Sequence, residues 1–76
     1  MESSPLQRAA VLHQEGSLDK AVQQLKALIK DDTANAEAYT LLAKCLNDQN
    51  KHSLADKAMI KANRIRNEAL SQWGLF

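Results

Sequence analysis

The sequence predicts an all-α protein. Its 76 residues include only 2 Gly and 1 Pro, and aromatic residues make up 4% of the chain. Helix breakers are therefore rare, and so are the aromatic residues that favour strands. Apolar residues recur at intervals of three and four, the period of a helix with one buried face. A chain of this length forms a single domain, which we assign to residues 1–76.

The first predicted helix begins at a strong N-terminal signal. Ser4 stands at the N-cap, Pro5 at the first helical position, and Gln7 where its side chain can complete a capping box. Gly16 ends this helix, since glycine readily adopts the left-handed conformation that follows a last turn.

The second helix follows directly, with Ser17 at its N-cap and Asp19 in its first turn. It ends at the polar residues Asp31, Asp32 and Thr33. Its apolar residues keep helical spacing throughout: Leu18, Ala21, Val22, Leu25, Leu28 and Ile29.

The third helix has Asn35 at its N-cap and Glu37 near the positive end of the helix dipole. Its apolar residues form two rows, Tyr39, Leu42, Ala43 and Leu46 in one and Ala38, Leu41 and Cys45 in the other. A face this wide predicts a helix packed on two sides. The turn that follows is predicted at residues 48–50.

The fourth helix is predicted to start between Lys51 and Ser53, where Ser53 and Asp56 resemble a capping box. No breaker occurs before Gly74, so the helix extends over about 20 residues, or roughly 30 Å. Its predicted buried face consists of Leu54, Ala55, Ala58, Met59, Ala62, Ile65, Ala69 and Trp73.

The chain repeats itself after 34 residues. The shift aligns Leu12 with Leu46, Gly16 with Asn50, Ala21 with Ala55, Leu25 with Met59, and Leu28 with Ala62. It also aligns Val11 with Cys45, which predicts an inward position for both. The units cover about residues 2–35 and 36–69, and an extension with an apolar tail covers 67–76.

A helix-turn-helix unit of 34 residues resembles the tetratricopeptide repeat family. The second unit matches its pattern at Tyr39, Leu42, Ala43, Leu46, Asn50, Ala55, Met59 and Ala62. Arg8 and Pro5 depart from the pattern in the first unit, and Thr33 and Asn67 stand where the family prefers proline. The resemblance implies two hairpins in a short right-handed superhelix, with the fourth helix extended because its proline is missing. A plain four-helix bundle is the alternative.

The resemblance also implies protein–protein interaction, with a peptide or helix bound in a groove lined by the first helix of each unit. The residues that match groove positions are Leu6, Gln7, Ala10, His13, Gln14, Glu37, Thr40, Leu41, Lys44, Asn47 and Asp48. The expected partner is another protein or peptide.

Two other functions remain open. The long last helix and the apolar tail could form a homodimer through Ile65, Ala69, Leu70, Trp73 and Phe76. The basic stretch 57–66 could contact nucleic acid or a membrane surface, although such a stretch is more often the solvated side of a helix, and the net charge is only +1. We expect neither nucleic acid nor membrane as the partner.

The sequence contains no pattern typical of a catalytic, metal or cofactor site. His13, Cys45 and His52 lack the spacing of metal ligands, and the two glycines are too far apart to form a phosphate-binding loop. We therefore expect a protein that is not an enzyme, with no cofactor and no small-molecule substrate. The N-terminus has no apolar signal core, which together with a lone cysteine favours a cytoplasmic location.

Overall fold

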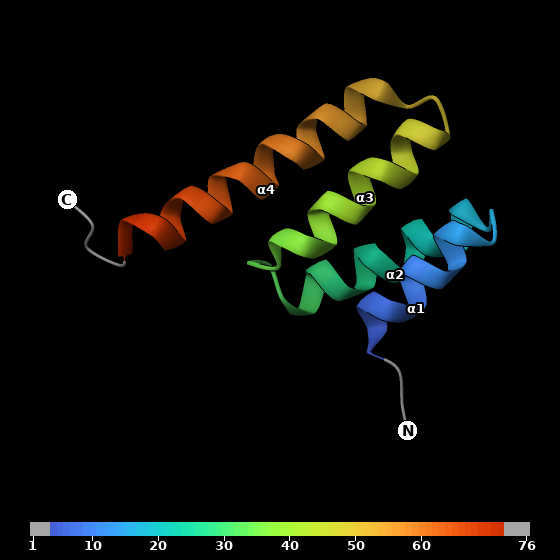
Figure 1. Cartoon of the computed structure of the whole chain (residues 1–76), viewed down its shortest axis with the longest axis horizontal. Coiled ribbons are helices and arrows are strands. Elements are labelled where there is room, and N and C mark those ends of the chain that lie inside the picture. The colour runs from blue at the N-terminus through green and yellow to red at the C-terminus, as the bar shows by residue number, and fades with distance from the viewer. Residues whose placement is uncertain (1–3, 73–76) are drawn as a thin grey trace.

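The computed structural model describes residues 4–72, with side chains through residue 70. It consists of four helices: α1 (Pro5–Gln14), α2 (Leu18–Asp31), α3 (Ala36–Asp48) and α4 (His52–Gln72). Figure 1 shows α1 paired with α2, α3 beside α2, and α4 beside α3. Within residues 4–72, α2 packs against α1 and α3, α3 also touches α1, and α4 packs only against α3. The prediction of an all-α fold built from helical hairpins is confirmed.

Two of the predicted helix starts are confirmed by their hydrogen bonds. Ser4 and Gln7 form a reciprocal capping box, in which the Gln7 N–H donates to Ser4 Oγ at 3.1 Å and the Ser4 N–H donates to Gln7 Oε1 at 3.3 Å. Asn35 Oδ1 accepts from the Ala38 N–H at 3.1 Å. Ser17 occupies the N-cap of α2, but its side chain makes no capping hydrogen bond.

The capping box predicted at Ser53 is wrong. The helix begins one residue earlier, at His52, and the carbonyl of Lys51 accepts from the Ala55 N–H at 3.0 Å. Ser53 therefore lies inside the first turn, where its side chain cannot act as an N-cap.

The turn between α1 and α2 and the turn between α3 and α4 have the same conformation. Gly16 and Asn50 are both left-handed, with φ of 84° and 64°. After them, the Ser17 N–H donates to the Leu12 carbonyl at 2.9 Å and the Lys51 N–H donates to the Leu46 carbonyl at 2.8 Å. Each of these hydrogen bonds joins the first and last residues of a six-residue segment, which is the pattern of a Schellman motif at a helix C-terminus. The backbone thus repeats with the 34-residue period of the sequence.

Small residues hold the helices close together. The buried residues are Ala9, Ala21, Val22, Leu25, Ala38, Leu42, Ala43, Cys45, Leu46, Ala55, Ala58 and Ala62, and none of the buried residues described is polar. Seven of these twelve are alanine, which allows neighbouring helix axes to approach. Ala21 is 0% and Ala55 1% exposed, so both lie at such contacts.

Several residues predicted to face inward are exposed instead. Val11 is 51% exposed although its counterpart Cys45 is buried, and Leu54, Met59 and Ala69 are also exposed. The cause is the number of neighbours. Among the residues that the structure describes, α4 packs only against α3 and α1 lies at the opposite end of the stack, so each leaves one side uncovered.

Candidate protein-binding groove

A shallow hollow lies where α1, α3 and the distal half of α4 approach one another. It is lined by Leu6 from α1, by Glu37, Thr40, Leu41 and Lys44 from α3, and by Arg66 from α4. Leu6 and Leu41 are half-buried against the core, whereas Glu37, Lys44 and Arg66 are exposed. The hollow therefore combines an apolar floor with a charged rim.

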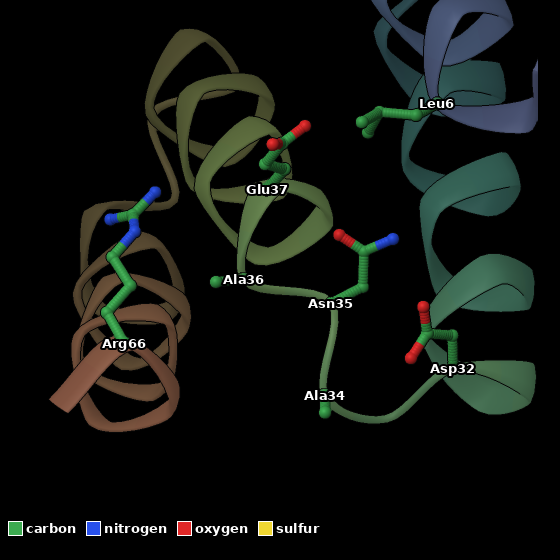
Figure 2. A pocket seen from close by; sticks show the side chains of 7 residues that line it. All are labelled: Leu6, Asp32, Ala34, Asn35, Ala36, Glu37 and Arg66. Carbon is green, nitrogen blue, oxygen red and sulfur yellow. The ribbon is translucent and has the colours of Figure 1, made fainter. Parts of the chain in front are cut away.

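A second hollow continues from the first past the N-terminal end of α3. It shares Leu6, Glu37 and Arg66 with the first, and its other lining residues are Asp32, Ala34, Asn35 and Ala36. Figure 2 shows Glu37 standing between Leu6 on one side and Arg66 on the other. The two hollows form one groove, which we call the α1/α3 groove.

Arg66 is tied to α3 by a hydrogen bond. Its Nη2 donates to Thr40 Oγ1 at 2.9 Å, and Thr40 Oγ1 in turn donates to the Ala36 carbonyl at 3.0 Å. The guanidinium is thereby held at the level of Thr40. Because it has five N–H donors, others remain to bind a ligand.

Polar side chains join the helices at the other end of α3. His13 Nε2 donates to Asp48 Oδ2 at 2.6 Å, which links α1 to α3. Gln49 Nε2 donates to Asp19 Oδ1 at 2.6 Å, which links the end of α3 to the start of α2. The hollow itself is lined by α3 residues from Glu37 to Lys44 and so does not reach this bond at the end of the helix.

The predicted groove residues divide into three sets. Leu6, Glu37, Thr40, Leu41 and Lys44 line the hollow, while Ala10 is half-buried and Gln14 exposed, both outside it. The other four have side-chain partners: Gln7 belongs to the capping box, His13 and Asp48 pair with each other, and Asn47 Oδ1 hydrogen-bonds His52 Nδ1 at 2.8 Å.

The residues predicted for a homodimer are only partly described. Ile65 is half-buried, and Ala69 and Leu70 are exposed near the end of α4. Trp73 and Phe76 lie outside the described residues.

Sequence reasoning missed Arg66, because the resemblance assigns groove residues to the first helix of each unit. Antiparallel packing of α3 and α4 about the turn at Asn50 brings Arg66 beside Thr40, so helix register was the signal that could have found it. The contribution of the loop residues Asp32 and Ala34 had no comparable signal.

The lone thiol lies in the core behind this groove. Cys45 is 0% exposed, and its burial, together with the negative charge of Asp48, raises the pKa of the thiol above 9.0. A thiol that stays protonated is a poor nucleophile. Within residues 4–72, no three His, Cys, Asp or Glu side chains gather in a way that could hold a metal ion. No helix in the same range has the length and apolar character needed to cross a bilayer.

Comparison with protein families supplies the remaining observation. The model of the tetratricopeptide repeat matches residues 12–73, well over half of the chain. The chain belongs to the tetratricopeptide repeat family. Repeats of this family are generally protein-interaction modules, and the four helices here form two of them. Comparison with curated proteins and with solved structures finds no match to the chain.

Proposed function

We propose that this tetratricopeptide repeat protein binds a segment of a partner protein in the α1/α3 groove. The observation that supports this best is the hollow in which Leu6 and Leu41 form an apolar floor beneath Glu37, Lys44 and Arg66. Binding sites for protein segments commonly combine an apolar anchor point with a polar rim that fixes orientation. The predicted groove residues Leu6, Glu37, Thr40, Leu41 and Lys44 are retained in this proposal, and Arg66 is added to them.

The proposal can be tested with peptides selected from a random display library on the immobilised protein. Their dissociation constants are then measured by fluorescence anisotropy against Leu41→Gln and Lys44→Glu, with Ile60→Glu as the control. Ile60 is 59% exposed on α4 and does not line the groove. We expect at least a tenfold loss of affinity in the two groove variants and none in the control. Circular dichroism checks that helicity is retained. Selected peptides that bind all three variants as tightly as the parent protein would exclude the groove.

A second function, self-association through α4, is supported by the apolar side chains this helix exposes. Leu54, Met59, Ile60 and Leu70 are 48%, 40%, 59% and 52% exposed. Figure 1 shows α4 continuing past the end of α3, where Ile65 and Ala69 border a further hollow with Thr33 and Ala34. A second copy that covered this end would remove the apolar surface from water.

Sedimentation velocity over a concentration series tests the second function. We expect a dimer at micromolar concentration, and a monomer for Leu70→Glu. The matched control Lys57→Glu changes charge elsewhere on α4 and should leave the dimer intact. A monomer at every concentration of the unaltered protein would rule this function out.

The basic stretch of α4 gives less support to nucleic-acid or membrane contact. Lys57, Lys61 and Arg64 follow one side of the helix at helical spacing, but Arg66 faces the groove and bonds Thr40. The four positive charges therefore do not form one surface.

A further inference from the structure

We infer that the partner of the α1/α3 groove is an amphipathic helix with one acidic and one basic residue two turns apart and aliphatic residues between them. This inference rests on the proposed function and specifies the chemistry of the bound segment. It comes from the order of charges along the groove.

The groove has acidic Asp32 at one end and basic Lys44 at the other, and Glu37 and Arg66 lie between them because they line both hollows. Asp32 and Glu37 lie at the N-terminal end of α3. Arg66 is held one turn further along by its bond to Thr40, and Lys44 follows one turn beyond that. All four side chains are exposed, and the only salt-bridge contact among residues 4–72, between His13 and Asp48, lies outside the hollow. Each of the four charges is therefore available to a partner.

The spacing of these charges matches a helix. Glu37 and Lys44 are seven residues apart on α3, which corresponds to about 10 Å along the helix axis. A partner helix lying along α3 has the same rise per residue, so its positions i and i+7 face Glu37 and Lys44 together. Its positions i+3 and i+4 then lie over Leu41 and Leu6, where leucine or isoleucine fits the apolar floor.

The charges act mainly on selectivity. Exposed ion pairs add little affinity, whereas a like charge placed opposite Glu37 or Lys44 is repelled. The partner's acidic residue therefore pairs with Lys44 and Arg66, and its basic residue with Glu37 and Asp32. The partner helix can run parallel or antiparallel to α3. In one direction its acidic residue comes first in the sequence, and in the other its basic residue comes first.

Three synthetic helical peptides test the inference. They share one sequence with a central Leu-Leu pair and differ only at positions i and i+7, which carry Glu and Lys, Glu and Glu, or Lys and Lys. Affinities are measured by fluorescence anisotropy at low ionic strength, where surface charges are screened least. We expect the unaltered protein to bind the mixed peptide at least fivefold more tightly than the other two.

Charge reversal in the groove should change the preferred peptide. Glu37→Lys leaves the rim mainly basic, so this variant should prefer the Glu/Glu peptide. Lys44→Glu leaves it mainly acidic, so this variant should prefer the Lys/Lys peptide. The control Lys57→Glu alters an exposed charge outside the groove and should keep the preference for the mixed peptide.

Failure of the inference differs from failure of the groove. If the three peptides bind equally, and Leu41→Gln weakens all of them, the groove is retained and the charge pattern is overturned. If none of the three binds, the inference is overturned as well. The proposed groove is excluded only if library-selected peptides also bind Leu41→Gln and Lys44→Glu as tightly as the parent protein.

Discussion

The helices α2 and α4 hold the same place in the two repeats but have different surroundings. Their turns and their hairpin contacts correspond, and Ala21 and Ala55 are both buried. Yet Leu25 in α2 is 0% exposed, while its counterpart Met59 in α4 is 40% exposed. The difference arises because α2 lies between α1 and α3, whereas α4 packs against α3 alone in the part of the chain that the structure describes.

The sequence of α4 agrees with this open position. Val22 is buried and Ile29 half-buried in α2, and the residues 34 positions later are Asp56 and Asn63, both exposed. The comparison teaches that the repeat period determines the backbone, while the number of neighbouring helices determines which positions must be apolar. The predictions that follow test this comparison at equivalent positions.

The largest difference is expected between Leu25 and Met59. Leu25→Ala removes a fully buried side chain and should lower the free energy of unfolding by about 2–5 kcal/mol. Met59→Ala truncates a partly exposed side chain and should cost under about 1 kcal/mol, because water already reaches it. Urea denaturation followed by circular dichroism measures both. Equal losses of unfolding free energy would show that Met59 is packed as completely as Leu25.

Overpacking should affect the two repeats alike. Ala21→Leu and Ala55→Leu each place a large side chain at a close helix contact, at a cost of about 1–3 kcal/mol. Ala27→Leu is the matched control, because Ala27 lies on the exposed side of α2. Thermal melts should show two lowered midpoints and an unchanged control. A normal midpoint in either buried variant would contradict the equivalence of the hairpins.

Exchanging the residue at the two left-handed positions should change stability in opposite directions. An added Cβ on Gly16 meets nothing within 4 Å, so Gly16→Ala should cost only the conformational penalty of positive φ, about 1–2 kcal/mol. Asn50→Gly relieves the same penalty and should stabilise by a few tenths of a kcal/mol. Chemical denaturation distinguishes the signs. A loss of stability in Asn50→Gly would mean that the asparagine side chain stabilises the turn by more than the positive φ of Asn50 destabilises it.

The smallest effect is expected at Cys45, whose counterpart Val11 lies on the open side of α1. The raised pKa means that the thiol ionises in the unfolded chain before it does in the folded protein. The contribution of this thiol to the free energy of unfolding is fully present below its ordinary pKa of 9.0. This contribution is lost as the pH rises from there through the pKa of the thiol in the folded protein. When the pH is raised above 9.0, the free energy of unfolding should therefore fall less in Cys45→Ala than in the parent protein. Parallel alkaline slopes in urea titrations would contradict the burial of the thiol.

The sequence was sufficient for the features that depend on local interactions. The capping box at Ser4, the N-cap at Asn35 and the turns at Gly16 and Asn50 each involve residues close together in the chain. Their chemistry can be evaluated without knowledge of the fold. At Ser53 the same reasoning failed, because α4 begins one residue before the capping pattern.

The features that depend on distant neighbours could not be predicted. Helical spacing placed Met59 on an apolar face, but spacing alone does not reveal that none of the described helices covers that face. The His13–Asp48 bond and the Arg66–Thr40 bond join residues 35 and 26 positions apart, and both follow from how the helices dock. The candidate groove was therefore predicted in its α3 residues and missed in its α4 residue.

The one-sided packing of α4 also sets the order in which the molecule comes apart. Within residues 4–72, unwinding α4 breaks contacts with α3 only and leaves α1, α2 and α3 packed together. Local opening of this kind needs less free energy than global unfolding. Amide hydrogen exchange should therefore be fastest in the part of α4 that extends beyond α3, slower towards His52, and slowest in α2 and α3, so that protection rises from the C-terminal end of the structure towards its middle.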